Sequence, residues 1–167
     1  RVDSVDRVFV NENPRLQTPS GYTQTNIMQK VRFKPDEKWD FNYGFHYSET
    51  SEYARYDRMA ELSKDGLPNS AVWNYGPQKW MMNHLEITHS GPNPVYDQLV
   101  IRVAYQKFEE SRIDRKFNNN RLRTQLEEVE ALSFNADFLK RSGKNNFFYG
   151  IEAVVNDVVS TGSAVNI

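Results

Sequence analysis

The sequence predicts an all-β fold, an antiparallel up-and-down meander of about six strands. The clearest indication is the segment Trp39–Ser48, in which every odd position is aromatic and every even position is polar or glycine. Because successive side chains of a strand point to opposite faces, this segment would have one aromatic face and one polar face. Weaker alternation recurs along the chain, and turn-forming residues separate the alternating segments.

Composition excludes several classes of protein. The chain has 167 residues with 13% aromatic residues and a mean hydropathy of -0.75, and its aromatic content argues against a disordered chain. The net charge is -1 without a basic stripe, which gives little support to a nucleic-acid partner. The absence of cysteine excludes disulfides, thiolate catalysis and cysteine metal sites. No apolar run is long enough for a membrane-spanning helix, whereas the weaker signal of a membrane β-barrel remains compatible with the sequence.

The first part of the chain predicts an arm followed by a hairpin. Residues 1–21 are polar and contain proline and glycine, so we expect a loop or extended arm with a possible short strand at Val8–Val10. An alternating strand follows over Tyr22–Lys34. Pro35–Lys38 has the residues of a turn, and it joins this strand to the aromatic segment Trp39–Ser48.

The next part predicts a long connection and an irregular strand. Residues 49–70 break the alternation and could form a short helix capped by Ser51 and ended near Gly66. Residues 71–88 resume strand character, but the apolar positions change phase along the segment. Such a change suggests a β-bulge, which we place near Asn83.

The following residues predict a tight turn, a strand and a charged connection. The turn is His89–Pro94, and the strand covers residues 98–106 with alternating aliphatic side chains. Residues 109–123 carry many charges and an asparagine run, so we expect a second long connection there.

The last part contains one ambiguous segment. Leucine and valine at spacings of three and four between residues 122 and 132 suit a helix, whereas the alternation over 129–140 suits a strand. We favour a strand because the alternation continues through a short turn at Lys140–Asn145 into a final strand at 147–156.

The connections alternate in length along the chain. Short turns centre on residues 36, 92 and 143, and the long connections fall between them together with both chain ends. Short turns at one rim and long loops at the other are typical of outer-membrane β-barrels, whereas a soluble sandwich more often mixes loop lengths at both ends.

Several short motifs in this order resemble the barrel of TonB-dependent outer-membrane receptors of the Bacteroidetes type. The segments that carry the resemblance are Tyr56–Arg58, Trp73–Gln78, Tyr105–Arg112, Arg115–Phe117, Tyr149–Glu152 and Asn156–Thr161. The resemblance implies that the chain is part of a large transmembrane β-barrel of about 22 strands. On this interpretation residues 1–21 are an extracellular arm, residues 22–160 a barrel segment and residues 161–167 the start of the next extracellular loop. The plug, the TonB box and the closing strand of such receptors have no counterpart here, so we expect a piece of a longer protein.

The resemblance also implies a function and partners. The whole receptor would take up a scarce nutrient, such as haem, an iron-siderophore, a vitamin or a glycan, across the outer membrane of a bacterial cell. Its partners would be outer-membrane lipid, its own plug, the TonB complex and the transported molecule, with no nucleic acid. The sequence indicates no cofactor and no enzyme, because it contains no nucleophile motif and no positioned catalytic carboxylates. The alternative is a soluble β-sheet domain that binds a ligand or partner through its aromatic face.

Six residues are candidates for ligand contact. His46 would lie on the polar face near the long-loop side, and aromatic rings at that rim could stack on a sugar, porphyrin or catecholate. Competing roles are a hydrogen-bonded histidine, packing at the loop base and weak surface ion pairs. No pair of histidines has metal-site spacing, so we predict no metal site. The candidates are His46, Tyr53, Tyr56, Trp73, Tyr75 and Arg112.

Overall fold

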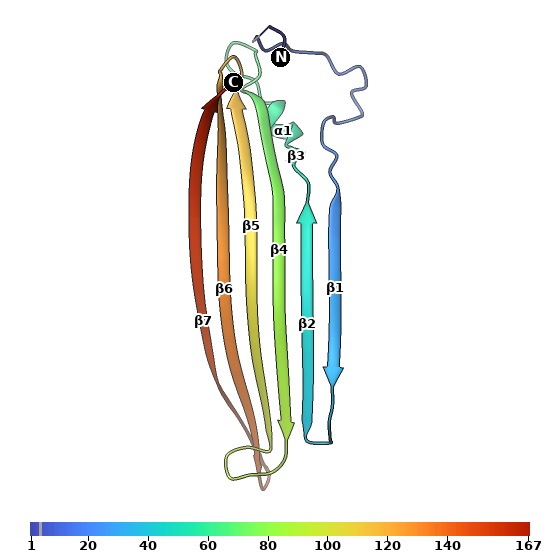
Figure 1. The fold of residues 1–167 in the computed structure, drawn as a ribbon, viewed down its shortest axis with the longest axis vertical. Coiled ribbons are helices and arrows are strands. Elements are labelled where there is room, and N and C mark those ends of the chain that lie inside the picture. Colours follow the sequence, from blue (N-terminus) through green and yellow to red (C-terminus); the bar gives the residue numbers. More distant parts are fainter. Residues whose placement is uncertain (4) are drawn as a thin grey trace.

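The computed structural model describes residues 1–3 and 5–167 and consists of one open antiparallel sheet (Figure 1). The sheet has seven strands in the order β1-β2-β4-β5-β6-β7, and the two-residue strand β3 pairs with β4. The all-β meander predicted from sequence is confirmed, and the sheet does not close on itself. No helix within the described residues is long and apolar enough to cross a membrane. The elements are β1 (Gln24–Phe33), β2 (Trp39–Thr50), β3 (Tyr53–Ala54), α1 (Tyr56–Met59), β4 (Ser70–Ser90), β5 (Gln98–Lys116), β6 (Arg121–Ser142) and β7 (Asn145–Asn166).

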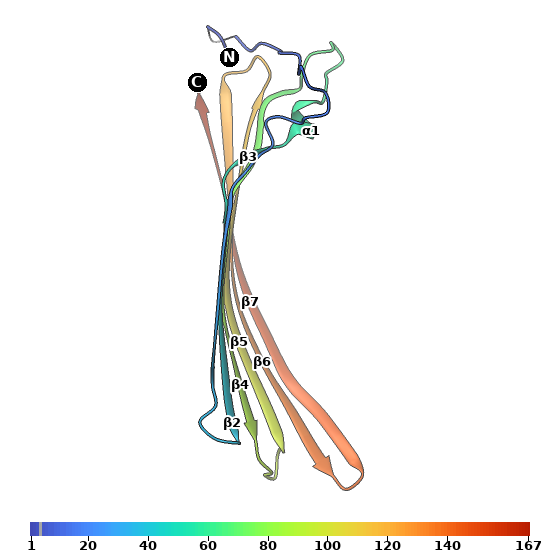
Figure 2. The same ribbon diagram turned by 90° about the vertical axis from the view of Figure 1, so that its right-hand side faces the viewer.

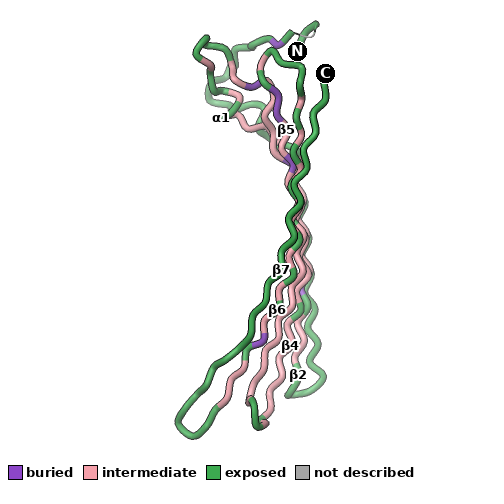
Figure 3. The backbone as a smooth tube through the Cα atoms, turned by 90° about the vertical axis from the view of Figure 1, so that its left-hand side faces the viewer, coloured by how far each residue is buried: buried purple, intermediate pink, exposed green. Residues whose placement is uncertain are grey.

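The sheet is a single layer without a hydrophobic core. Seen from the side, the strands form one twisted, curved layer, and the loops gather at one end (Figure 2). Buried segments are few along the chain (Figure 3). Among the described residues the only buried hydrophobic side chain is Ala136. A compact domain of this length would remove more than half of its surface from water. The apolar side chains of this sheet are therefore at least partly exposed over most of its length.

Short turns lie at one end of the sheet, opposite α1 and both chain termini (Figure 1). In the turn between β1 and β2, the Asp36 carboxylate accepts hydrogen bonds from the backbone N–H groups of Lys38 and Trp39 at 2.7 and 2.9 Å. These bonds favour the ionised carboxylate and lower the pKa of Asp36. The three predicted short turns lie at one end, but the opposite end also has a short connection, residues 117–120, so the predicted layout of short turns at one end and long connections at the other is confirmed only in part.

Two expected loops are in fact strands. β5 continues to Lys116 and β6 begins at Arg121, so the connection expected over 109–123 is reduced to residues 117–120. Residues 161–166, expected to begin a loop, pair with β6 as part of β7. Backbone pairing does not require apolar side chains, and ion pairs such as Arg123–Asp114 connect the polar parts of neighbouring strands. The segment 129–140 is a strand, as favoured.

Two smaller expectations at the loop end are wrong. Val8–Val10 does not form a strand. The helix begins at Tyr56 rather than after Ser51, and its N-cap residue Arg55 makes no side-chain capping bond. Ser51 instead extends the hairpin, because its N–H donates to the Thr23 carbonyl at 2.9 Å and its hydroxyl accepts from the Thr23 N–H at 3.0 Å.

The register of β4 against β5 shifts at two places, between Ser70 and Val72 and at Gly76 and Pro77, and not near Asn83. Asn83 pairs regularly with Phe45 and Tyr105, whereas the register against β5 shifts between Tyr75 and Gln78. The bulge changes which side chains point to which face. Trp73 and Tyr75 consequently lie on the same face as the even-numbered residues beyond the bulge.

Gly76 is required at this bulge for two reasons. Its φ is +88°, a conformation that other residues adopt with strain, and an added Cβ would lie 2.8 Å from the Ser51 carbonyl oxygen. We expect Gly76→Ala to lower the free energy of unfolding by about 1–3 kcal/mol. Gly162→Ala is the matched control, because a Cβ there meets nothing within 4 Å. Equilibrium urea unfolding of both variants would measure the difference, and equal midpoints would contradict the assigned role of Gly76.

Candidate functional site: an arginine and aromatic cluster on the polar face

The two faces of the sheet differ in chemistry because its register aligns residues of one kind. The row Val31, Tyr43, Leu85, Val103, Phe134 and Ala153 crosses all six long strands, and each member pairs with the next. Neighbouring rows on this face are mostly apolar, with Gln29, Asn83 and His89 as polar members. We call the set the apolar band. It comprises Ile27, Val31, Phe33, Trp39, Phe41, Tyr43, Phe45, Tyr47, Met81, Leu85, Ile87, Leu99, Ile101, Val103, Tyr105, Leu132, Phe134, Ala136, Phe138, Phe147, Tyr149, Ile151, Ala153 and Val155.

The apolar band ends abruptly toward the loop end of the sheet. The next residues on this face are charged, and ion pairs join Lys79 to Glu109 and Lys107 to Glu130, each at 3.2 Å. We call this set the charged belt, and it comprises Glu49, Lys79, Lys107, Glu109, Glu128, Glu130 and Asp157. Chemistry on one face therefore changes along the strands while their pairing continues.

Both edges of the apolar band shift in the same direction across the sheet. On β2 the band runs from Trp39 to Tyr47, and on β7 it runs from Phe147 to Val155. Tyr149, and not Phe147, lies in the row of Trp39, so the band on β7 is displaced by one row toward the short turns. The band is consequently inclined to the rows of paired residues.

The opposite face carries a polar network at the height of the apolar band. The guanidinium of Arg102 donates to Glu86 at 2.8 Å and to Asp137 at 2.6 Å, which connects three strands. Arg32 pairs with Asp40 on the hairpin of β1 and β2. We call this side the polar face.

Between this network and the loop end of the sheet, three aromatic rings and two arginines gather on the polar face. The ring centroids of Trp73 and Tyr75 are 4.9 Å apart, and those of Tyr53 and Tyr75 are 6.0 Å apart. The Cζ atom of Arg55 lies 5.4 Å from each of the Trp73 and Tyr75 centroids, and that of Arg112 lies 5.8 and 5.3 Å from them. Such distances permit cation–π attraction. We call these five residues the rim cluster.

The arginines at this end differ in their partners. Arg55 forms two hydrogen bonds to Asp57, which lower the pKa of that carboxylate to about 2, and Arg58 pairs with Glu61 at 2.7 Å. Arg112 approaches only Glu110, at 3.8 Å, and its buried Nε atom has no hydrogen-bond partner among the described residues. Arg112 is therefore the least satisfied guanidinium of the rim cluster.

The structure brings together four of the six candidate residues. Tyr53, Trp73, Tyr75 and Arg112 belong to the rim cluster, and burial raises the pKa of the Tyr53 phenol. Tyr56 lies apart from them, on α1, where it lines a hollow with Met59, Ser70 and Arg115.

His46 is also separate from the rim cluster. It lies on the polar face in β2, paired with Met28 and Met82, and its ring centroid is 6.0 Å from that of Trp80. No group of three or more His, Cys, Asp or Glu side chains within the described residues could hold a metal ion.

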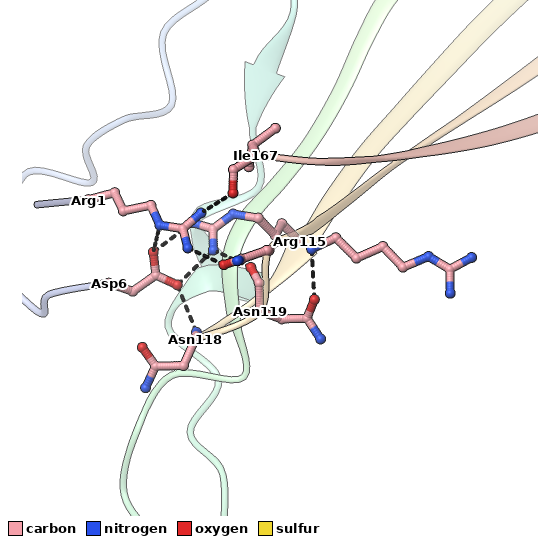
Figure 4. A network of polar contacts seen from close by, with 8 residues as sticks. Arg1, Asp6, Arg115, Asn118, Asn119 and Ile167 are labelled. Carbon is pink, nitrogen blue, oxygen red and sulfur yellow. Dashed lines mark hydrogen bonds and ion pairs between the residues drawn. The ribbon is translucent and has the colours of Figure 1, made fainter. Parts of the chain in front are cut away.

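Sequence reasoning missed Arg55 and the contact between Asp6 and Arg115. Arg55 follows Tyr53 by two positions, so strand periodicity could have placed both on one face. Asp6 accepts from the Nη1 and Nη2 atoms of Arg115 at 2.7 and 2.8 Å, and from the Asn118 N–H at 2.7 Å (Figure 4). Both side chains of this pair are buried. No local pattern predicts a pair so distant in sequence.

Comparison with protein-family models finds no family that matches the chain. Comparison with curated proteins likewise finds no match.

Proposed function

We propose that this chain is a segment of the wall of an outer-membrane β-barrel, in a TonB-dependent receptor that takes up a scarce nutrient. The apolar band carries this proposal. It crosses one face of all six long strands, and within the described residues no second layer packs on it. In an outer-membrane barrel that face would contact acyl chains, and the polar face would line the interior.

The dimensions of the apolar band suit a bilayer. Its extent over 39–47 on β2 and 147–155 on β7 is close to the roughly 9–11 residues with which a tilted strand crosses a membrane. In a barrel the strands tilt relative to the axis, so a band parallel to the membrane must be inclined to the rows of paired residues. The apolar band is displaced by one row between β2 and β7, so it is inclined to the rows as a barrel requires.

The boundaries of the apolar band also suit a membrane interface. Trp39, Tyr96, Phe138 and Tyr149 gather near the short turns, with Phe138 and Tyr149 stacked at 5.1 Å, as in the aromatic girdle of a barrel. The charged belt would lie at the level of the lipid headgroups on the other side. The loop end, with the rim cluster, would then be extracellular.

The open edges of the sheet fit a part of a larger barrel. β1 and β7 each have one unpaired edge, and long exposed edges are a hazard that closed barrels remove. Further strands, a plug and the TonB complex would complete the receptor and its energy supply. Haem, an iron-siderophore, a vitamin or a glycan would enter from the loop end.

Cysteine labelling tests the membrane assignment, because this chain has no cysteine of its own. The Phe134→Cys variant places a thiol in the apolar band, and the Glu130→Cys variant places one in the charged belt on the same face of β6. In cells that carry the intact protein, we expect a water-soluble maleimide to label only the Glu130→Cys variant. A lipid-soluble maleimide should label the Phe134→Cys variant.

Two results would reject the proposal in favour of the soluble β-sheet domain. One is recovery of the intact protein in the soluble fraction. The other is equally fast reaction of both variants with the water-soluble reagent, because Phe134 is 40% exposed in the bare sheet.

A further inference from the structure

We propose that Arg112, held against the rings of Trp73 and Tyr75, recognises a carboxylate or phosphate group on an incoming ligand. This inference rests on the proposed function, which makes the polar face the interior of a channel. It adds the chemical class of the ligand, an oxyanion attached to a flat apolar group.

The bonding state of Arg112 is the first argument. A guanidinium has five N–H donors in a planar fork that matches the oxygens of a carboxylate or phosphate. Within the described residues Arg112 donates no hydrogen bond, and its nearest carboxylate, Glu110, lies beyond hydrogen-bond distance at 3.8 Å. Buried donors are usually satisfied, and an exception needs an explanation. The Arg112 side chain is 36% exposed, so its Nη groups can reach a bound oxyanion, which would supply them with acceptors.

The aromatic rings are the second argument. Tyr75 and Arg112 are directly paired in the register, and the Arg112 Cζ atom lies 5.3 Å from the Tyr75 centroid. Contact with the rings limits the orientations of the guanidinium, so less conformational entropy is lost when a ligand binds. Tyr53 and Tyr75 are themselves only partly buried and could stack on a flat part of the ligand.

The neighbouring charges are the third argument. The Cζ atoms of Arg55 and Arg58 lie 5.4 and 5.9 Å from the Trp73 centroid, but both guanidiniums are already paired, with Asp57 and Glu61. Glu110 and its cross-strand partner Glu127 lie one row below Arg112 on the same face. These carboxylates oppose an anion, so the preference of the site must come from Arg112 itself.

Binding of three related probes to the intact protein in non-ionic detergent tests the inference. The probes are 2-naphthoate, 2-naphthyl phosphate and the neutral 2-naphthamide, and titration calorimetry measures each dissociation constant. We expect at least one anionic probe to bind roughly 10–100-fold more tightly than the amide, the range for hydrogen bonds to charged groups. The tighter anion identifies which oxyanion the site prefers.

Four variants assign the preference to residues. Arg112→Gln should abolish the difference between the anionic and neutral probes, and Arg112→Lys should retain part of it. Glu110→Gln should strengthen anion binding by removing the opposing charge. Arg121→Gln is the control, because it removes an exposed cation of β6 that lies on the polar face, as Arg112 does. It should leave all three dissociation constants unchanged. Near-ultraviolet circular dichroism of each variant checks the fold.

The inference is overturned if the three probes bind the unaltered protein equally or if Arg112→Gln retains the preference. Failure of this test leaves the labelling pattern of the Phe134→Cys and Glu130→Cys variants unaffected. Failure of the proposed function would instead appear in that labelling pattern.

Discussion

On the proposed membrane assignment, replacing Val103 with arginine is expected to lower the free energy of unfolding by about 2–4 kcal/mol. Val103 lies in the central row of the apolar band, between Leu85 and Phe134. In the proposed barrel, a guanidinium at that height would face lipid and lie farthest from water on either side of the bilayer. The cost is that of removing a charge from water without a partner.

Ala104→Arg is the matched control for this prediction. Ala104 is the next residue of the same strand, and its row on the polar face contains His84 and Ser133. An arginine there would project into a wet interior and should cost much less. Urea unfolding in phosphatidylcholine vesicles, followed by tryptophan fluorescence, would compare the two variants. Equal destabilisation would mean that lipid does not cover the apolar band.

The alternation of side chains predicted the six long strands because strand periodicity is local. Trp39–Tyr47 and the aliphatic positions from Leu99 to Tyr105 locate strands wherever one face is apolar. The same criterion failed over 109–116 and 161–166, where both faces are polar or mixed. Alternating hydrophobicity appears only where the two faces of a strand have different surroundings. Strand pairing itself depends on backbone hydrogen bonds, so these segments pair without that pattern.

The apparent phase change near Asn83 does not mark the bulge of β4. Trp80 and Met82 lie on the polar face, and Leu85 and Ile87 lie in the apolar band, in a strand that is regular at Asn83. Two large apolar residues on the polar face mimic a break in register. The actual bulge coincides with Gly76, whose backbone conformation and close neighbour explain it.

The candidate site could be predicted only in part. The bulge brings Trp73 and Tyr75 onto the face of Arg112, and no sequence pattern specified that alignment. Tyr56 was grouped with them because it is close in sequence, but it lies on α1 and lines a different hollow. Alternation assigns side chains to a face, whereas which of them meet depends on the register between strands.

Replacing Asp6 with asparagine is expected to detach the amino-terminal arm from the end of β5. The bidentate pair with Arg115 is buried, with exposed side-chain fractions of 4% for Asp6 and 5% for Arg115. Removing one member of a buried pair typically costs about 3–5 kcal/mol, because the other charge remains buried without its partner. We expect trypsin to cut after Arg7 and Arg15 much faster in this variant. Asp3→Asn, at an exposed position of the same arm, is the control and should leave the cleavage rate unchanged.

The pH dependence of the same contact is a separate measure of its strength. The hydrogen bonds from Arg115 lower the pKa of Asp6 from 3.8 to about 2, a difference of roughly 2 kcal/mol. Because the pKa is lower in the folded state, this stabilisation is complete above about pH 4 and is lost as the pH falls toward 2. Hydrogen exchange of the arm should therefore show an opening free energy that is constant from pH 5 to 8 and decreases below about pH 4. The pH-dependent contribution is smaller than the expected effect of Asp6→Asn, because substitution also leaves Arg115 with fewer acceptors. An opening free energy that began to fall near pH 6 would mean that a group other than Asp6 holds the arm.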